Sequence, residues 1–110
     1  MIKTTITNIE NKIKLNASIQ DKEKTELLNL LTSLQSEISE LSKIDSEHAE
    51  SITGFTQTSA HEATRKAKNE QLLNLSLKGL TSSVDELETS HPKLVEIVNR
   101  IAQALSNMGI

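Results

Sequence analysis

The sequence contains no cysteine, tryptophan or tyrosine, and Phe55 is its single aromatic residue. Without cysteine there is no disulfide framework, no thiol nucleophile and no cysteine-based zinc site. One proline and three glycines are too few for the many turns of a β-sandwich or β-barrel. These absences favour an all-α architecture, and a length of 110 residues fits one domain over residues 1–110.

Long apolar runs and an excess of positive charge are also absent. No stretch reaches the roughly 18 consecutive apolar residues of a membrane-spanning helix, and the first residues lack the apolar core of a signal peptide. The net charge of −3 gives no general attraction to nucleic acid or to anionic lipid. We therefore expect a cytoplasmic protein with neither nucleic acid nor a membrane as its partner.

The sequence is rich in aliphatic side chains at helical spacing. Isoleucines recur every three or four positions over residues 2–15, and Leu/Ile rows over residues 27–41 and 73–87 have a period of about 3.5, as in coiled coils. Pro92 suits the first position of a last helix, and Gly109 is typical of a helix end. The sequence thus predicts helices over residues 2–15, 19–53, 60–89 and 92–108.

The segment between the two leucine-rich rows is poor in apolar residues. Glycine, threonine and serine cluster over residues 54–59, which favours a chain reversal, and Ser59 with Glu62 has the spacing of a capping box. We therefore expect a helical bundle built on a long antiparallel helical hairpin that resembles a coiled coil. Its polar arm would cover residues 45–71, and the short N- and C-terminal helices would pack at the other end.

The last predicted helix is apolar around more than half of its circumference, so another surface must cover it. A small bundle with many aliphatic and few aromatic side chains buries more surface by pairing with a second copy. We therefore predict a homo-oligomer, a dimer or higher, although monomeric bundles have similar rows. The predicted interface residues are Leu94, Val98, Ile101, Leu105 and Met108.

The three histidines do not form a recognisable catalytic or metal motif. His61 and Glu62 resemble the start of a zinc-protease helix, but Arg65 stands where the second ligand is needed. His48 is interpreted as a solvated surface residue, and His91 before Pro92 as a helix cap. We therefore predict no catalytic residue, no metal site and no cofactor.

Gly79 lies inside the predicted third helix, where glycine costs about 1 kcal/mol relative to alanine. The position is interpreted as a tolerated surface glycine, and close approach of another helix is the alternative.

Three C-terminal stretches carry a resemblance to a known family: residues 90–94 (Ser-His-Pro-Lys-Leu), 99–102 (Asn-Arg-Ile-Ala) and 104–110 (Ala-Leu-Ser-Asn-Met-Gly-Ile). The chain resembles an uncharacterised family of short bacterial proteins, helical or coiled-coil, that is classed as a domain of unknown function. The specific part of the resemblance covers about the last 22 residues. It implies a bacterial origin and a helix that begins at His-Pro, and it brings no catalytic residue or ligand.

Together these patterns predict a non-enzymatic helical interaction or scaffold protein that self-associates through its Leu/Ile rows. The alternative is a regulatory binder, an inhibitor or chaperone-like protein, that holds a specific partner protein through the apolar last helix or the arm.

Overall fold

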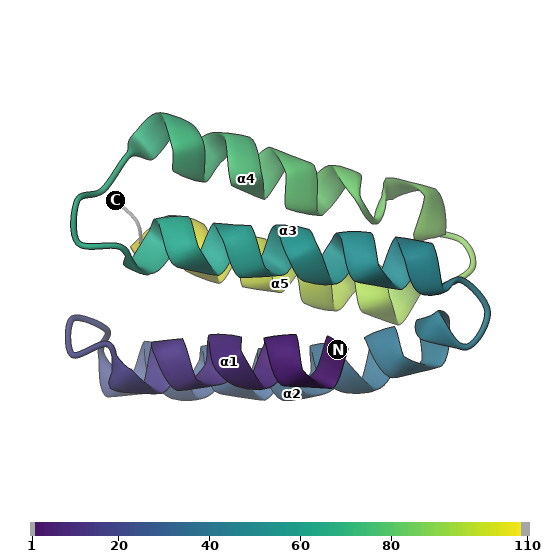
Figure 1. Cartoon of the computed structure of the whole chain (residues 1–110), viewed down its shortest axis with the longest axis horizontal. Coiled ribbons are helices and arrows are strands. Elements are labelled where there is room, and N and C mark those ends of the chain that lie inside the picture. The colour runs from purple at the N-terminus through teal and green to yellow at the C-terminus, as the bar shows by residue number, and fades with distance from the viewer. Residues whose placement is uncertain (1, 109–110) are drawn as a thin grey trace.

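The computed structural model describes residues 2–108, in which five α-helices and one 3₁₀ turn form a bundle (Figure 1). The bounds are α1 Ile2–Leu15, α2 Asp21–Ser42, α3 Ser46–Thr64, α4 Glu70–Ser82, η1 Asp85–Leu87 and α5 Pro92–Met108. No strand occurs in these residues, so the predicted all-α class is confirmed. The helix end expected at Gly109 lies outside the described residues.

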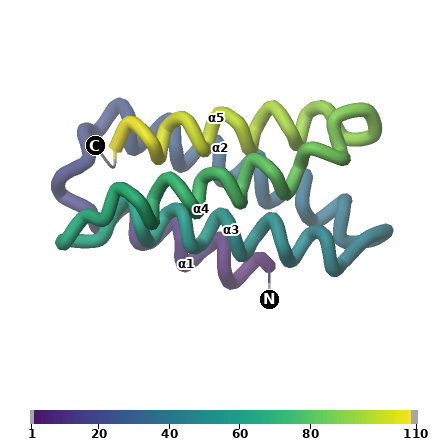
Figure 2. The backbone as a smooth tube through the Cα atoms, turned by 90° about the horizontal axis from the view of Figure 1, so that it is seen from above, coloured from purple at the N-terminus to yellow at the C-terminus, as the bar shows by residue number. Residues whose placement is uncertain are grey.

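Each helix runs antiparallel to the one before it, so the connections alternate between the two ends of the bundle (Figures 1 and 2). The helices α2, α3 and α5 pack against one another. The helix α1 lies against α2 and α3, and α4 lies against α3 and α5. The bundle measures 37 × 24 × 22 Å, and α2, at about 1.5 Å per residue, spans nearly its whole length.

The aliphatic rows of α1, α2 and α5 form most of the core. Ile6, Ile9 and Ile13 of α1 are buried together with the leucines of α2 and with α5 in one apolar cluster. Full burial of one such side chain stabilises the fold by about 1.5–3 kcal/mol. The Ile and Leu spacing seen in the sequence therefore corresponds to the inward faces of these helices.

The single helix expected over residues 19–53 is two helices in the structure. The helix α2 ends at Ser42, and the chain turns at residues 43–45 before α3 begins. Asp45 is the N-cap of α3, because its Oδ1 accepts a hydrogen bond from the backbone N–H of His48 at 3.0 Å. A new helix therefore begins here, and α2 does not continue. The long-helix prediction was wrong because it followed the aliphatic period and did not weigh this cap.

The reversal expected at residues 54–59 is instead the middle of α3. Buried Thr53 and Thr56 donate from their hydroxyls to the carbonyls of Ala49 and Ile52, both at 2.8 Å, so their polar groups are satisfied inside the helix. Gly54 also fits inside the helix, because its φ is not positive, as is true of every residue among 2–108. Small side chains let this polar helix pack against α1, α2, α4 and α5.

The arm expected over residues 45–71 is therefore absent from the described structure, because α3 lies inside the bundle. The real reversal covers residues 65–69, and Asn69 caps α4 by accepting from the N–H of Leu72 at 3.0 Å. Ser59 does not cap a helix, since it is buried in the middle of α3. The helix expected over residues 60–89 is shorter, with α4 ending at Ser82 and the 3₁₀ turn η1 following it.

Candidate functional site

The predicted interface row on α5 lies in the core of the single chain. Leu94, Val98, Ile101 and Leu105 are buried by the chain itself, and Met108 is partly buried against the same cluster. The helices α2, α3 and α4 cover the apolar face of α5. This face is therefore buried without a second copy of the chain. The surface available for contacts must therefore be sought elsewhere.

Three exposed apolar side chains on α3 and α4 form what we call the α3–α4 apolar patch: Phe55, Leu72 and Leu75. Their exposed fractions are 40%, 41% and 65%. Leu72, Leu75 and Gly79 are spaced by three and four residues, so they share one face of α4. The two helices lie side by side along the bundle (Figures 1 and 2). Sequence reasoning missed this patch because it followed only the row over residues 73–87, which contains neither Leu72 nor Leu75 as a member, and placed Phe55 in a turn.

The ring of Phe55 joins the two halves of the patch. A Cβ atom built on Gly79 would lie 2.6 Å from Phe55 Cδ1, a distance that real Cβ atoms essentially never show, and 3.1 Å from Phe55 Cζ. Gly79 therefore permits the close approach of α3, the alternative interpretation of this glycine. The ring lies against Gly79, which is one turn along α4 from Leu75, and this places Phe55 and Leu75 on the same side of the helix pair.

The two helix segments that carry the patch contain almost no charged residues and are bordered by Glu50, Glu62 and Glu70. Residues 51–61 of α3 and residues 71–78 of α4 contain no Asp or Glu, and Lys78 is the single Lys or Arg in the two ranges. One residue in four is charged in the chain as a whole. Depletion of charge and enrichment of aromatic residues distinguish the centre of protein interfaces from other surface. The α3–α4 face has both features.

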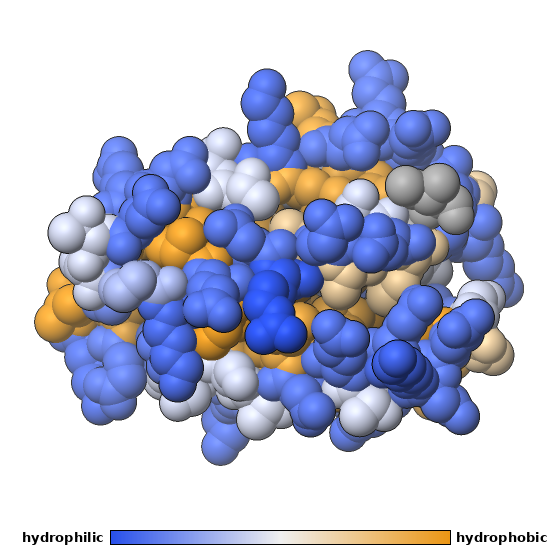
Figure 3. Space-filling model, turned by 180° about the vertical axis from the view of Figure 1, so that it is seen from behind, coloured by the Kyte–Doolittle hydropathy of each residue, from blue (hydrophilic) through white to orange (hydrophobic). Residues whose placement is uncertain are grey.

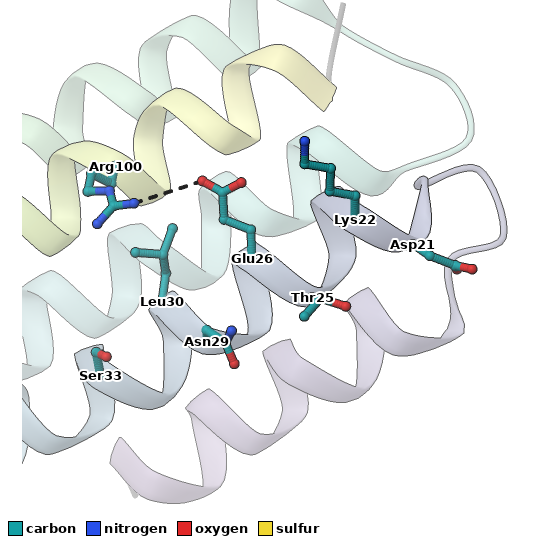
Figure 4. Close-up of a pocket in the computed structure, with 8 residues that line it drawn as sticks. All are labelled: Asp21, Lys22, Thr25, Glu26, Asn29, Leu30, Ser33 and Arg100. Carbon is teal, nitrogen blue, oxygen red and sulfur yellow. Dashed lines mark ion pairs between the residues drawn. The ribbon is translucent and has the colours of Figure 1, made fainter.

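A groove of about 660 Å³ lies on the other side of the bundle, along α2 (Figure 4). Arg100 of α5 points toward Glu26 of α2, and Arg100 Nη2 lies 4.0 Å from Glu26 Oε1. Such an exposed pair contributes about 0–1 kcal/mol. The polar residues that line the groove are all exposed, and hydrophilic side chains cover most of this side of the molecule (Figure 3). We therefore regard the groove as solvated surface.

The histidines are not brought together. His48 is partly buried, and its Nε2 contacts the carbonyl of Ser83 at the end of α4, so the expected solvated role was wrong. His61 is exposed, with Nε2 3.9 Å from Glu62 Oε2. His91 stands directly before α5, and its Nδ1 lies 3.0 Å from Ser90 Oγ. Within residues 2–108 no group of three or more His, Asp or Glu side chains is arranged to hold a metal ion.

The described residues form an up-and-down helical bundle, and the α3–α4 apolar patch lies on its surface. The chain belongs to the family described as domain of unknown function DUF4404, whose model matches residues 27–110. The predicted resemblance to an uncharacterised family is thereby confirmed, and the match begins within α2 and leaves out α1. No curated protein and no solved structure matches the chain. None of the helices in the described part of the chain is long and apolar enough to span a bilayer.

Proposed function

We propose that this protein is a non-enzymatic helical interaction protein that self-associates, and that it does so through the α3–α4 apolar patch. The exposure of Phe55, Leu72 and Leu75 on a face that is nearly free of charge carries this proposal. The Leu/Ile rows do not support it, because those side chains are buried within one chain. A bacterial origin and a cytoplasmic location remain parts of the proposal.

The physical drive for this contact is the removal of apolar surface from water. Each square ångström of apolar surface that becomes buried contributes about 25 cal/mol. Leu75 is 65% exposed and Phe55 is the chain's single aromatic residue, so both gain from a covering surface. A charge-poor face also avoids the cost of stripping water from unpaired ionic groups.

The test is the mass of the purified protein by size-exclusion chromatography with light scattering. A self-associating chain gives a multiple of 12.1 kDa. Leu75→Glu should shift the mass to that of the monomer, because a carboxylate would have to be buried in the contact. Leu15→Glu is the matched control, since Leu15 is 86% exposed at the end of α1, outside the patch. A wild-type protein that stays at 12.1 kDa at high concentration would overturn the proposal.

The alternative is a regulatory binder that covers the same face with a helix of another protein. An exposed apolar patch supports both, because an amphipathic helix can lie in such a surface. The binder is monomeric alone and forms a stoichiometric heteromeric complex in lysate, which Leu75→Glu would abolish and Leu15→Glu would leave intact. The mass of the isolated chain thus separates the two functions.

A further inference from the structure

We propose that copies of this chain also associate head to tail, with the basic end of one bundle docked on the acidic end of the next. The basic end is the one at the connections 16–20 and 65–69, and the acidic end is the one at the connections 43–45 and 83–91 (Figure 1). The contact goes beyond the proposed function, because it does not use the α3–α4 apolar patch. Its two surfaces differ, so it is heterologous and has no two-fold axis.

The charges of the chain are divided between the two ends. Near the basic end, residues 12–24, 61–70 and 104–108 contain seven Lys or Arg and four Asp or Glu residues. Near the acidic end, residues 38–50 and 82–96 contain two Lys and eight Asp or Glu residues. All other residues of the chain contain three of each sign, so with neutral histidines the ends carry +3 and −6 and the rest carries zero. The bundle is therefore an electric dipole along its long axis.

Helix capping does not account for the whole acidic end. Glu40 lies in the last turn of α2, and Asp85 and Glu86 directly follow the C-terminal end of α4. A negative charge near a helix C-terminus is unfavourable, because the negative end of the helix dipole lies there. Local helix stability thus opposes these carboxylates, whereas a basic surface of another molecule would stabilise them.

Each end also presents an exposed aliphatic side chain. Leu15, the last residue of α1, is 86% exposed, and Ile44, in the turn after α2, is 75% exposed; these are the highest values among the large apolar residues described. Leu15 lines a shallow hollow of about 400 Å³ together with Lys12, Arg65 and Lys66. None of the Asp and Glu side chains in residues 2–108 lines this hollow. It therefore fits an aliphatic side chain that is accompanied by carboxylates.

The chain itself carries that complement, which identifies a second copy as the occupant. Ile44 stands on the turn between Glu40 and Glu47, and both carboxylates are exposed. The 22 residues of α2 span about 33 Å between the two ends, so the ends cannot meet within one copy. The 24 × 22 Å cross-section of the bundle limits the contact to about 500 Å² on each side, which is typical of weak interfaces. Repetition of the contact builds an open row of copies.

Disulfide cross-linking tests the contact, because the native chain has no cysteine. Leu15→Cys and Ile44→Cys are made as separate variants, each with Leu75→Glu to remove the contact through the patch. Mixed at low salt under mild oxidation, they should form a covalent heterodimer, since a disulfide needs Cα atoms within roughly 7 Å. Asn29→Cys, exposed in the middle of α2, replaces Leu15→Cys in the control mixture. Circular dichroism verifies that every variant folds.

Charge reversal tests the role of the basic end. In the Leu75→Glu background, Lys66→Glu should weaken association at low salt about fivefold, because it removes a cation from the hollow. Lys78→Glu is the matched control, since Lys78 is exposed on α4 between the two ends and the charge change is the same. Sedimentation at high protein concentration compares the two. Salt at about 0.5 M should screen the contact, so the masses of Leu15→Glu and Leu75→Glu that test the patch are measured there.

The outcomes separate the head-to-tail contact from the proposed function. It is overturned if the mixture gives no more heterodimer than the Asn29→Cys control, which includes the case of a basic end that binds another kind of polyanion. Homodimers of either single variant in equal yield, or equal effects of Lys66→Glu and Lys78→Glu, also overturn it. A heterodimer that forms selectively and is lost at high salt establishes it. A wild-type chain that is monomeric at high salt overturns only the contact through the patch.

Discussion

The phenyl ring of Phe55 occupies the space that a side chain at position 79 would need. An ideal Cβ on Gly79 would come within 2.6 Å of Phe55 Cδ1. The absence of a side chain at this point of α4 lets α3 approach closely, and Phe55 remains 40% exposed. The pair therefore links the packing of two helices to the proposed contact surface.

A double-mutant cycle should show that Phe55 and Gly79 are energetically coupled. Alanine favours a helix over glycine by about 1 kcal/mol, so Gly79→Ala should stabilise the protein by that amount once Phe55→Ala has removed the ring. In the presence of Phe55 the new methyl group must displace the ring, and the gain should shrink by at least ~0.5 kcal/mol or change sign. Urea unfolding in a monomeric Leu75→Glu background measures all four free energies. Additivity within error would contradict the observed proximity.

Ser59→Ala should stabilise the protein by about 1 kcal/mol. Ser59 Oγ is buried and has no hydrogen-bond partner among the described residues, so the native fold bears the cost of its desolvation. Ser76→Ala is the control, because Ser76 Oγ is also buried but donates to the carbonyl of Leu73 at 2.8 Å. Thermal unfolding should show a higher midpoint for Ser59→Ala alone. Equal midpoints for the two variants would contradict this account.

His48→Ala should destabilise the protein by about 1–2 kcal/mol. Its side chain bridges the first turn of α3 and the carbonyl of Ser83, and truncation leaves that carbonyl without its side-chain partner. His61→Ala is the control, because His61 is exposed and surface substitutions stay within about ±0.5 kcal/mol. Chemical unfolding at neutral pH compares the two. The bridge is unimportant if both variants lose the same stability.

Ile101→Asp should abolish the fold and not merely the assembly. Ile101 is fully buried in the core, and an unpaired carboxylate there is unfavourable by several kcal/mol. Arg100→Ala, one residue away, removes an exposed side chain and should retain the helical spectrum. Far-ultraviolet circular dichroism distinguishes them. If Ile101→Asp is folded and monomeric while the unmodified protein is an oligomer, then the predicted interface row on α5 is a contact between copies and this account is wrong.

Aliphatic spacing predicted the parts of the fold that depend on one face only. The helices α1 and α5 occupy the ranges that the sequence predicts. Their Ile, Leu and Val side chains lie together on one side only when the segment is helical, and that side can then be buried. The rows of α2 also face the core as expected. The same pattern could not show whether a second copy or the chain itself covers α5, because both would bury the same side chains.

The candidate site was beyond sequence reasoning for a similar reason. The predicted row includes Leu73 and leaves Leu72 and Leu75 on another face of the helix. Only the packing of α4 against α3 and α5 shows that this other face stays exposed in the described structure. The caps at Asp45 and Asn69 were visible in the sequence as residue types that favour helix starts. The sequence did not show whether the helix would end at these caps or continue with the aliphatic period. The packing of the helices decided that new helices begin there.

By itself the sequence determined an all-helical chain, because it has no cysteine, has few of the glycines and prolines that a many-turned β fold needs, and repeats its aliphatic side chains at helical spacing. The tertiary structure alone decided that residues 54–59 are helix. The serine, threonine and glycine residues of this range suit a turn equally well. They are helical because α3 packs against four neighbouring helices, and because hydroxyls such as that of Thr56 donate to the backbone one turn earlier.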